Sequence, residues 1–141
     1  MKKLVVLVIV LLCNITYSGA QSKIPEKVTK AFEQKFKNAT LVKWNKENDH
    51  EYEASFEWNG QKHSANFSDS GAWIETESSI TYAQLPEKVK STFAKDHKKA
   101  LVKSIYKIEN AKKEIKYEIE IKENLNTIEF IYDSNGKLIK T

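Results

Sequence analysis

The stretch "IPEKVTKAF" at residues 24–32 is nearly repeated as "LPEKVKSTF" at residues 85–93. In each copy a proline stands where a helix would begin, a position at which its missing N–H leaves no hydrogen bond unmade. Apolar residues then recur four residues apart, as at Val28 and Phe32, which is the spacing of one face of a helix. The sequence therefore predicts an internal duplication in which each copy opens with a helix.

Extended segments rich in branched and aromatic residues follow each helix, "ATLVKWNK" from Ala39 and "ALVKSIYKI" from Ala100. The pair Asn59-Gly60 then predicts a two-residue hairpin turn, because both residues tolerate positive φ. That turn places Tyr52 opposite Phe67, Ala54 opposite Ala65, Phe56 opposite His63 and Trp58 opposite Gln61. Aligning the second hairpin with the first places Tyr117, Ile119 and Ile121 opposite Tyr132, Phe130 and Ile128. A further turn in each copy leads to a last strand, which begins near Trp73 or Leu138.

Each copy is thus expected to contain one helix followed by four strands. We expect an α+β fold of two tandem repeats, each with one helix packed on the apolar face of a four-stranded antiparallel sheet. Repeat 1 would span residues 21–78, a linker residues 79–84 and repeat 2 residues 85–141. The pattern leaves open whether the two sheets are continuous or only abut. Trp44 and Trp73 align with Ile105 and Leu138, so we expect both tryptophans to belong to the core.

The first 20 residues have the three parts of a secretory signal peptide: two lysines, an apolar run from Leu4 to Cys13, and the small residues Ser18-Gly19-Ala20. We expect cleavage near Ala20 and a periplasmic or secreted protein. The cleaved chain would lack cysteine, and therefore disulfides and thiolate metal ligands. The apolar run is too short for a membrane span, so the mature chain is expected to have none.

All 23 basic residues are lysine, and the net charge is +4, or +2 once Lys2 and Lys3 are removed. Without arginine the chain has no guanidinium group for bidentate hydrogen bonds to phosphates or base edges. It also lacks the strongly basic charge of nucleic-acid-binding proteins. We therefore expect no nucleic-acid partner. The two copies differ in charge, from 7 lysines against 10 acids in residues 24–78 to 13 against 9 in residues 85–141. The difference could steer a partner, although interspersed charges also suit a plain solvated surface.

Alternation along the strands places polar side chains, Glu129 among them, on the sheet face away from the helices. We interpret this outward face as the candidate site for a protein or peptide partner. Trp58 aligns with Glu123 at the tip of a hairpin, so it is the candidate exposed aromatic contact. The predicted partner-binding residues are Glu51, Glu53, Glu57, Trp58, Lys62, Lys116, Glu118, Glu120 and Lys122.

The chain resembles the PepSY-like, beta-lactamase-inhibitor-like family over nearly all of its expected mature length. The resemblance rests on the order and spacing of the Pro-x-x-Val-x-x-x-Phe helix opening, "VKW" at residues 42–44, "YEASF" at residues 52–56 and "SDSGAWIETE" at residues 68–77. It implies exported bacterial proteins with tandem helix-plus-sheet repeats like those of beta-lactamase inhibitory proteins, in which the sheet forms a concave protein-binding surface. It brings no catalytic motif, and a shared fold does not confer a shared target.

We expect no enzyme activity, no cofactor and no metal site. Ser64 follows His63, but adjacent strand residues point to opposite faces, so the two do not form a nucleophile and its base. His50 and His63 alone provide too few ligands for a metal site. The stretch from Asp133 to Gly136 resembles half of a calcium-binding loop, but a hairpin turn accounts for its residues. The predicted function is a non-enzymatic periplasmic module that binds a protein or peptide, with inhibition of a hydrolase or peptidase as a narrower form. The alternative is a carrier of a small ligand or metal ion that uses the aromatic residues of repeat 1 and His63. The sequence identifies neither the partner nor the oligomeric state.

Overall fold

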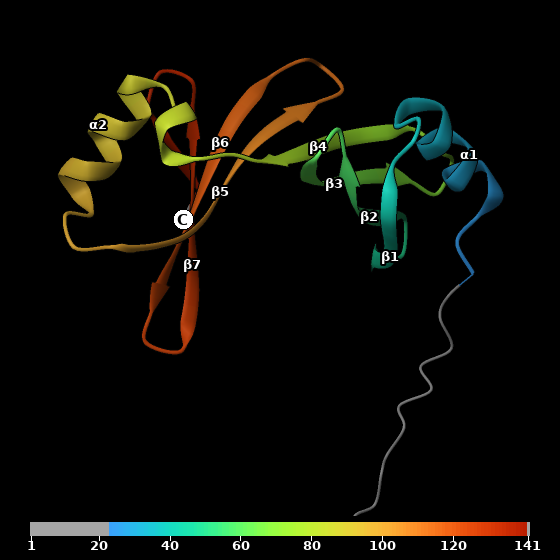
Figure 1. Cartoon of the computed structure of the whole chain (residues 1–141), viewed down its shortest axis with the longest axis horizontal. Helices are drawn as coiled ribbons and strands as arrows, with labels where there is room; N and C mark the ends of the chain where they lie inside the picture. Colours follow the sequence, from blue (N-terminus) through green and yellow to red (C-terminus); the bar gives the residue numbers. More distant parts are fainter. Residues whose placement is uncertain (1–22, 141) are drawn as a thin grey trace, which may run out of the picture.

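The computed structural model of the chain describes residues 23–140, so the predicted signal peptide and its cleavage site near Ala20 lie outside the described part (Figure 1). The described residues form two α-helices, a short 3-10 helix and eight strands. The α+β class is thereby confirmed. In chain order the elements are α1 (Glu26–Lys35), β1 (Thr40–Asn48), β2 (Glu51–Trp58), β3 (Gln61–Ser68), β4 (Trp73–Ser79), η1 (Tyr82–Gln84), α2 (Glu87–Asp96), β5 (Leu101–Asn110), β6 (Ile115–Glu123), β7 (Asn126–Asp133) and β8 (Leu138–Lys140).

The two α-helices begin and end in the same way. Each begins directly after a proline, whose carbonyl accepts hydrogen bonds from the first turn, as in the 2.9 Å bond from Val28 N–H to Pro25 O. Each ends at a residue whose N–H donates to the phenylalanine carbonyl four residues earlier, over 2.8 Å: Phe36 to Phe32 in α1 and His97 to Phe93 in α2. The near-identical sequences at residues 24–32 and 85–93 therefore fold into helices with equivalent boundaries.

The eight strands form one antiparallel sheet in chain order, β1 to β8. The predicted pairs of the first hairpin are all present, and Asn59 and Gly60 both have positive φ (52° and 76°), as a tight hairpin turn requires. The predicted pairs of the second hairpin are present as well. β1, at one edge, is bent by two register shifts, and Leu41 in it has φ of 53°. β8, at the other edge, has only three residues.

The question of whether the two sheets are continuous is answered by β4 and β5, which pair from Glu75↔Asn110 to Ser79↔Tyr106. The eight strands therefore form one continuous sheet, which is one of the two possibilities that the sequence left open. The connection between these two strands contains η1 and α2 rather than a tight turn, so no local signal in the sequence reports the pairing.

Two separate hydrophobic clusters lie on the helix side of this sheet. One packs Val28 and Phe32 of α1 against β2 and β3, and the other packs Val89 and Phe93 of α2 against β6 and β7. The predicted core residues Tyr52, Phe56, Ile119 and Phe130 are all buried. Figure 1 shows the two helices at opposite ends of the twisted sheet.

Cross-strand partners show that both helices cover the same face. Ala65 belongs to the first cluster and pairs with Thr76, Thr76 pairs with Glu109, and Glu109 pairs with Ile115, from which alternation leads to buried Ile119. Partners that lie directly opposite in a sheet share a face. At the centre of the sheet this face is polar, with Thr76 and Glu109 between the two clusters. Neither α-helix covers the other face, which we call the open face.

Two glycines allow the strand turns to approach the helices. Gly71 has φ of 86°, and a Cβ there would lie 2.7 Å from the carbonyl oxygen of Lys27 in α1. Gly136 has φ of 81°, and its Cβ would lie 2.5 Å from the carbonyl oxygen of Lys88 in α2. Each helix is thus held at its first turn against the loop before the last strand of its half.

This close approach predicts different costs for two glycine substitutions. Gly60→Ala, in an open turn with no neighbour within 4 Å, introduces only backbone strain, and we expect a loss of about 1 kcal/mol in the free energy of unfolding. Gly136→Ala adds a clash with backbone, and we expect a loss of about 2 to 4 kcal/mol. Urea unfolding of the two variants measures the difference. Equal losses would show that the contact of Gly136 with α2 is unimportant.

Candidate functional site: an acidic trough on the open face

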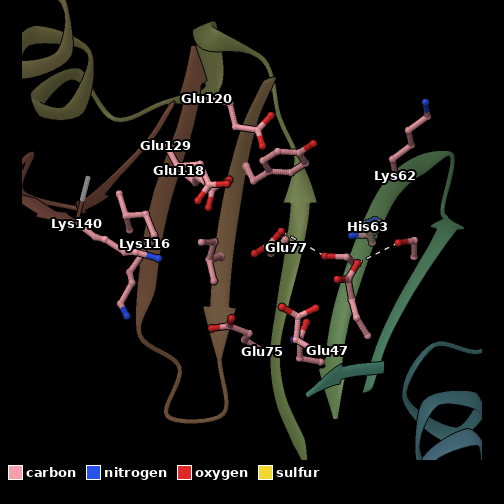
Figure 2. Close-up of a pocket in the computed structure, with 17 residues that line it drawn as sticks. Glu47, Lys62, His63, Glu75, Glu77, Lys116, Glu118, Glu120, Glu129 and Lys140 are labelled. Carbon is pink, nitrogen blue, oxygen red and sulfur yellow. Dashed lines mark hydrogen bonds between the residues drawn. The ribbon is translucent and has the colours of Figure 1, made fainter. Parts of the chain in front are cut away.

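The open face of the sheet is hollowed into a cavity of about 670 Å³, to which all eight strands contribute (Figure 2). We call it the acidic trough. Its apolar members are few, chiefly Tyr106, Ile108 and Ile131. Three lysines, Lys62, Lys116 and Lys140, also line it. They are outnumbered by seven carboxylates, those of Glu47, Glu53, Glu75, Glu77, Glu118, Glu120 and Glu129.

Strand register brings these side chains together. Tyr106 of β5 pairs with Glu118 of β6, and Glu118 pairs with Ile131 of β7. On the other side of the β4–β5 junction, Glu77 pairs with both Ser64 and Ile108. Partners of this kind stand on one face with Cβ atoms about 5 Å apart. The trough is therefore a direct product of the continuous sheet, with carboxylates from both halves on one surface.

Serine hydroxyls hold several of the trough carboxylates. Ser55 Oγ donates to Glu53 Oε1 over 3.1 Å, and Ser64 Oγ donates to Glu77 Oε2 over 3.2 Å. Burial raises the pKa of Glu77 above its ordinary value, although the hydrogen bond from Ser64 opposes this, because it stabilises the anion. These contacts fix the carboxylates in place on the face without neutralising their charge.

Glu118 is the most enclosed charged side chain described, with 8% of its surface exposed. Burial and, after it, the neighbouring carboxylates of Glu77, Glu129 and Glu120 together raise its pKa to about 7, while Lys140 acts in the opposite direction. Among the described residues, no hydrogen bond or ion pair within 4 Å holds its carboxylate. The floor of the trough thus contains a carboxyl group that is half protonated near neutral pH.

Five of the nine predicted partner-binding residues line the acidic trough: Glu53, Lys62, Lys116, Glu118 and Glu120. Three others lie outside its lining, namely Glu51, Glu57 and Lys122. Glu51 accepts a hydrogen bond from Asn48 at the turn between β1 and β2. Glu129 was expected on this face and is there. The sequence-based prediction did not include Glu75 and Glu77. Alternation along "WIETESS" at residues 73–79 would have placed both on this face.

Trp58 does not belong to the open face, so its prediction as an exposed aromatic contact is corrected. Its ring is partly buried and packs edge-on against Phe36, with ring centroids 5.4 Å apart. Its Nε1–H donates to the carbonyl oxygen of Lys37 over 2.9 Å. Trp58 thus packs against the C-terminal end of α1 and covers the sheet there. Its environment depends on the position at which α1 ends. Trp44 and Trp73 pack against the same cluster, as expected.

His50 and His63 have separate partners. His50 Nδ1 lies 3.2 Å from Asp69 Oδ2 at an exposed loop, whereas His63 Nδ1 lies 3.0 Å from Ser78 Oγ. The ring of His63 also stacks on Phe56, and burial lowers its pKa. Within the described part of the chain, neither histidine belongs to a cluster of possible metal ligands. Among residues 23–140, the side chains whose ligand atoms converge are those of Glu118, Glu120 and Glu129.

Comparison with known proteins identifies the class of this fold. The chain belongs to the PepSY-like family: the family model described as "Putative beta-lactamase-inhibitor-like, PepSY-like" matches residues 16–62 and 50–140. A search of curated proteins found no match. Within the described residues, no helix has the length and apolarity needed to span a membrane.

Solved structures from Bacteroides species share the fold. A "putative periplasmic protein" from Bacteroides eggerthii superposes with a TM-score of 0.74 at 18% identity, covering 82% of this chain and 86% of that one. A DUF2874 family protein from Bacteroides ovatus gives 0.71 at 22% identity, covering 82% and 84%. A BLIP-like protein from Bacteroides fragilis gives 0.67 at 18% identity, with the same coverage of 82% and 84%. At these identities the likeness concerns the fold.

The raised pKa of Glu118 predicts how stability depends on pH. In buffer without divalent cations, the folded chain keeps the proton of Glu118 between its ordinary pKa of 4.5 and about 7, while the unfolded chain has released it. Stability should therefore be highest below that range and fall as pH rises through it. Glu118→Gln removes the part of this dependence that Glu118 contributes, and leaves the part of the same sign that comes from the raised pKa of Glu77. We expect the variant to match wild type near about pH 4 and to be more stable by about 2 kcal/mol above pH 7.

Urea unfolding across this pH range measures the effect, with the exposed Glu114→Gln as the control for loss of one charge. A Glu118→Gln variant whose pH profile parallels wild type would contradict the assignment of Glu118 as the buried acid.

Proposed function

We propose that this protein is a non-enzymatic periplasmic module whose acidic trough holds a segment of another protein or a peptide. The single observation that carries the proposal is the trough itself, a continuous hollow of about 670 Å³ on a face that neither helix covers. The residues assigned to partner contact are those of the predicted set that line it, Glu53, Lys62, Lys116, Glu118 and Glu120, together with Glu75, Glu77 and Glu129.

The chemistry of the trough suits a polar, cationic segment better than a small apolar ligand. Pockets for small molecules are lined mainly by hydrophobic and aromatic side chains with few polar groups. Here seven carboxylates face three lysines, and half-buried serines fix two of the carboxylates. A segment that presents lysine or arginine side chains would place its charges opposite these carboxylates. Inhibition of a hydrolase or peptidase is the narrower form of this function.

Two organisational features complete the proposal. We take residues 21–78 and 85–141 as tandem repeats, each with one helix over four strands, joined by residues 79–84; the equivalent helix boundaries and the two hydrophobic clusters support this division. Residues 1–20 are proposed as the export signal, in keeping with the description of the Bacteroides eggerthii structure.

The chemistry of the hydroxyl groups supports a non-enzymatic role. His63 Nδ1 is within hydrogen-bond distance of Ser78 Oγ, but within residues 23–140 no carboxylate is bonded to that imidazole. Ser64 donates to the carboxylate of Glu77, which is a poor arrangement for removing the proton of the hydroxyl at neutral pH. A nucleophile needs an activating base that is itself oriented, and these two serines each have only one part of that arrangement.

A second candidate function, a small-ligand carrier, is favoured by a groove of about 310 Å³ between α1 and β1. Phe32, Phe36, Val42 and Trp44 line it, so it is more apolar than the trough and contains some of the aromatic residues of repeat 1. His63 is not part of this groove. A ligand bound there would contact Trp44, so it should shift tryptophan fluorescence, whereas a segment in the trough would leave the fluorescence unchanged.

The trough function predicts a loss of partner capture on charge reversal. We expect the double variant Glu53→Lys, Glu75→Lys to lose the proteins that the tagged mature protein captures from a cell-envelope extract, because both carboxylates line the trough. The matched control is Glu114→Lys, Glu123→Lys, which makes the same change in net charge at exposed positions near two turns. It should capture the wild-type set.

Circular dichroism and urea unfolding establish that both double variants are folded. Identical capture by wild type and the trough variant would rule out the acidic trough as the binding site. Loss of capture by the control as well would show that net charge, not the trough, recruits the proteins.

A further inference from the structure

Three carboxylates converge at one end of the acidic trough. Glu118 and Glu120 are two residues apart on β6 and therefore share a face, and Glu129 of β7 is directly opposite Glu120. Oxygen atoms of the three side chains all lie within 4.8 Å of one another. Figure 2 shows the three carboxylates gathered on the trough side of the two strands. We call this group the carboxylate cluster.

The cluster concentrates negative charge in an unfavourable way. Like charges that face each other across two strands destabilise a sheet, and Glu120 faces Glu129. Lys103 Nζ lies 3.3 Å from Glu120 Oε2, and Ser104 Oγ donates to the same carboxylate, so Glu120 has partners. Lys140 of β8 and Lys116 of β6 also line the trough, yet neither forms an ion pair with the cluster among the described residues.

Glu118 is an independent indication of a missing partner. The residue is more than nine-tenths buried, and within residues 23–140 no donor bonds its carboxylate. The carboxylate oxygens are not themselves fully enclosed, because they open onto the trough. A buried charge normally has a partner that compensates for the water it has lost. The side chain therefore points its oxygens at a position where a positive group would be stabilised by all three carboxylates.

We propose that the carboxylate cluster is a divalent-cation site, in which Glu118, Glu120 and Glu129 bind a hard ion such as Ca²⁺. Ca²⁺ binds six to eight oxygens at flexible geometry, and three carboxylates can supply three to six of them, with water in the rest. The cluster contains neither imidazole nor thiolate, so softer metals such as Zn²⁺ and Cu²⁺ have no preferred ligand there. Mg²⁺ demands a stricter octahedron and suits two adjacent strands less well.

A single ion fits this geometry better than a lysine or arginine from a partner. The oxygens approach one point from two strands, and Glu118 at the floor is enclosed, so a small sphere can touch all three side chains. A guanidinium group would need a planar, more open arrangement. The ion would join β6 to β7 through side chains in addition to their backbone ladder. The site shares Glu118, Glu120 and Glu129 with the surface assigned to partner contact, but ion binding itself needs no partner protein.

Terbium luminescence tests the site directly. Tb³⁺ is a hard oxygen-seeking ion, and Tyr106, the cross-strand partner of Glu118, stands where it can transfer excitation energy to a bound ion. We expect wild type to give sensitised emission that saturates and is displaced by Ca²⁺. Glu118→Gln and Glu129→Gln should each weaken binding by at least about tenfold, because each removes one charged ligand. Glu75→Gln, in the trough but outside the cluster, should leave it unchanged.

The opposite results overturn the proposal. Absence of sensitised emission in wild type would mean that the three carboxylates share protons rather than a metal ion. Emission that persists equally in Glu118→Gln and Glu129→Gln would mean that Tb³⁺ binds elsewhere. Circular dichroism establishes that each variant is folded. Failure of Tb³⁺ binding together with capture that depends on Glu53 and Glu75 would remove the cation site and leave the proposed function intact.

Discussion

The hydrogen-bonded ladder between β4 and β5 is the constraint on which the rest of the molecule depends. The hydrophobic clusters do not cross it, because the helix side of the junction is polar at Thr76 and Glu109. Backbone pairing, rather than a shared hydrophobic core on the helix side, therefore aligns the two halves, with strands about 4.8 Å apart. That pairing places Glu77 opposite Ile108, and through the following strands it brings carboxylates of both halves onto one face. A chain with the same hairpins but separate sheets would have two small polar surfaces and no trough.

Features set by local chemistry could be predicted from the sequence, and features set by distant pairing could not. Asn59-Gly60 determined the register of the first hairpin, and the predicted internal duplication extended the prediction to the second. The prolines at residues 25 and 86 marked both helix starts. The β4–β5 ladder has no such signal, because η1 and α2 separate its strands and a long connection leaves the register to tertiary contacts.

The candidate site shows the same division. Alternation identified the open face, five of the predicted partner-binding residues in the trough, and Glu129. Bringing Glu77 to Glu118 and Glu129 requires a register that crosses the junction. Charge counts were a poor guide: residues 85–141 are net positive, yet that half contributes the carboxylate cluster, because net charge does not report on which face each side chain lies. Trp58 was misplaced because its alignment with Glu123 was interpreted as exposure, whereas alternation places it on the helix side, where its ring packs against Phe36.

The two outer strands differ from ordinary sheet edges. β1 is bent by two register shifts and by the positive φ of Leu41, and β8 is only three residues long. An uninterrupted, flat edge offers a row of unpaired N–H and C=O groups that can template strand addition and cross-β growth. Here the bulges and the short strand interrupt that row, although Leu41 and Ile139 are exposed nearby. The fold can therefore leave one face of the sheet without a covering layer, and its edge strands still do not offer a regular template for fibril growth.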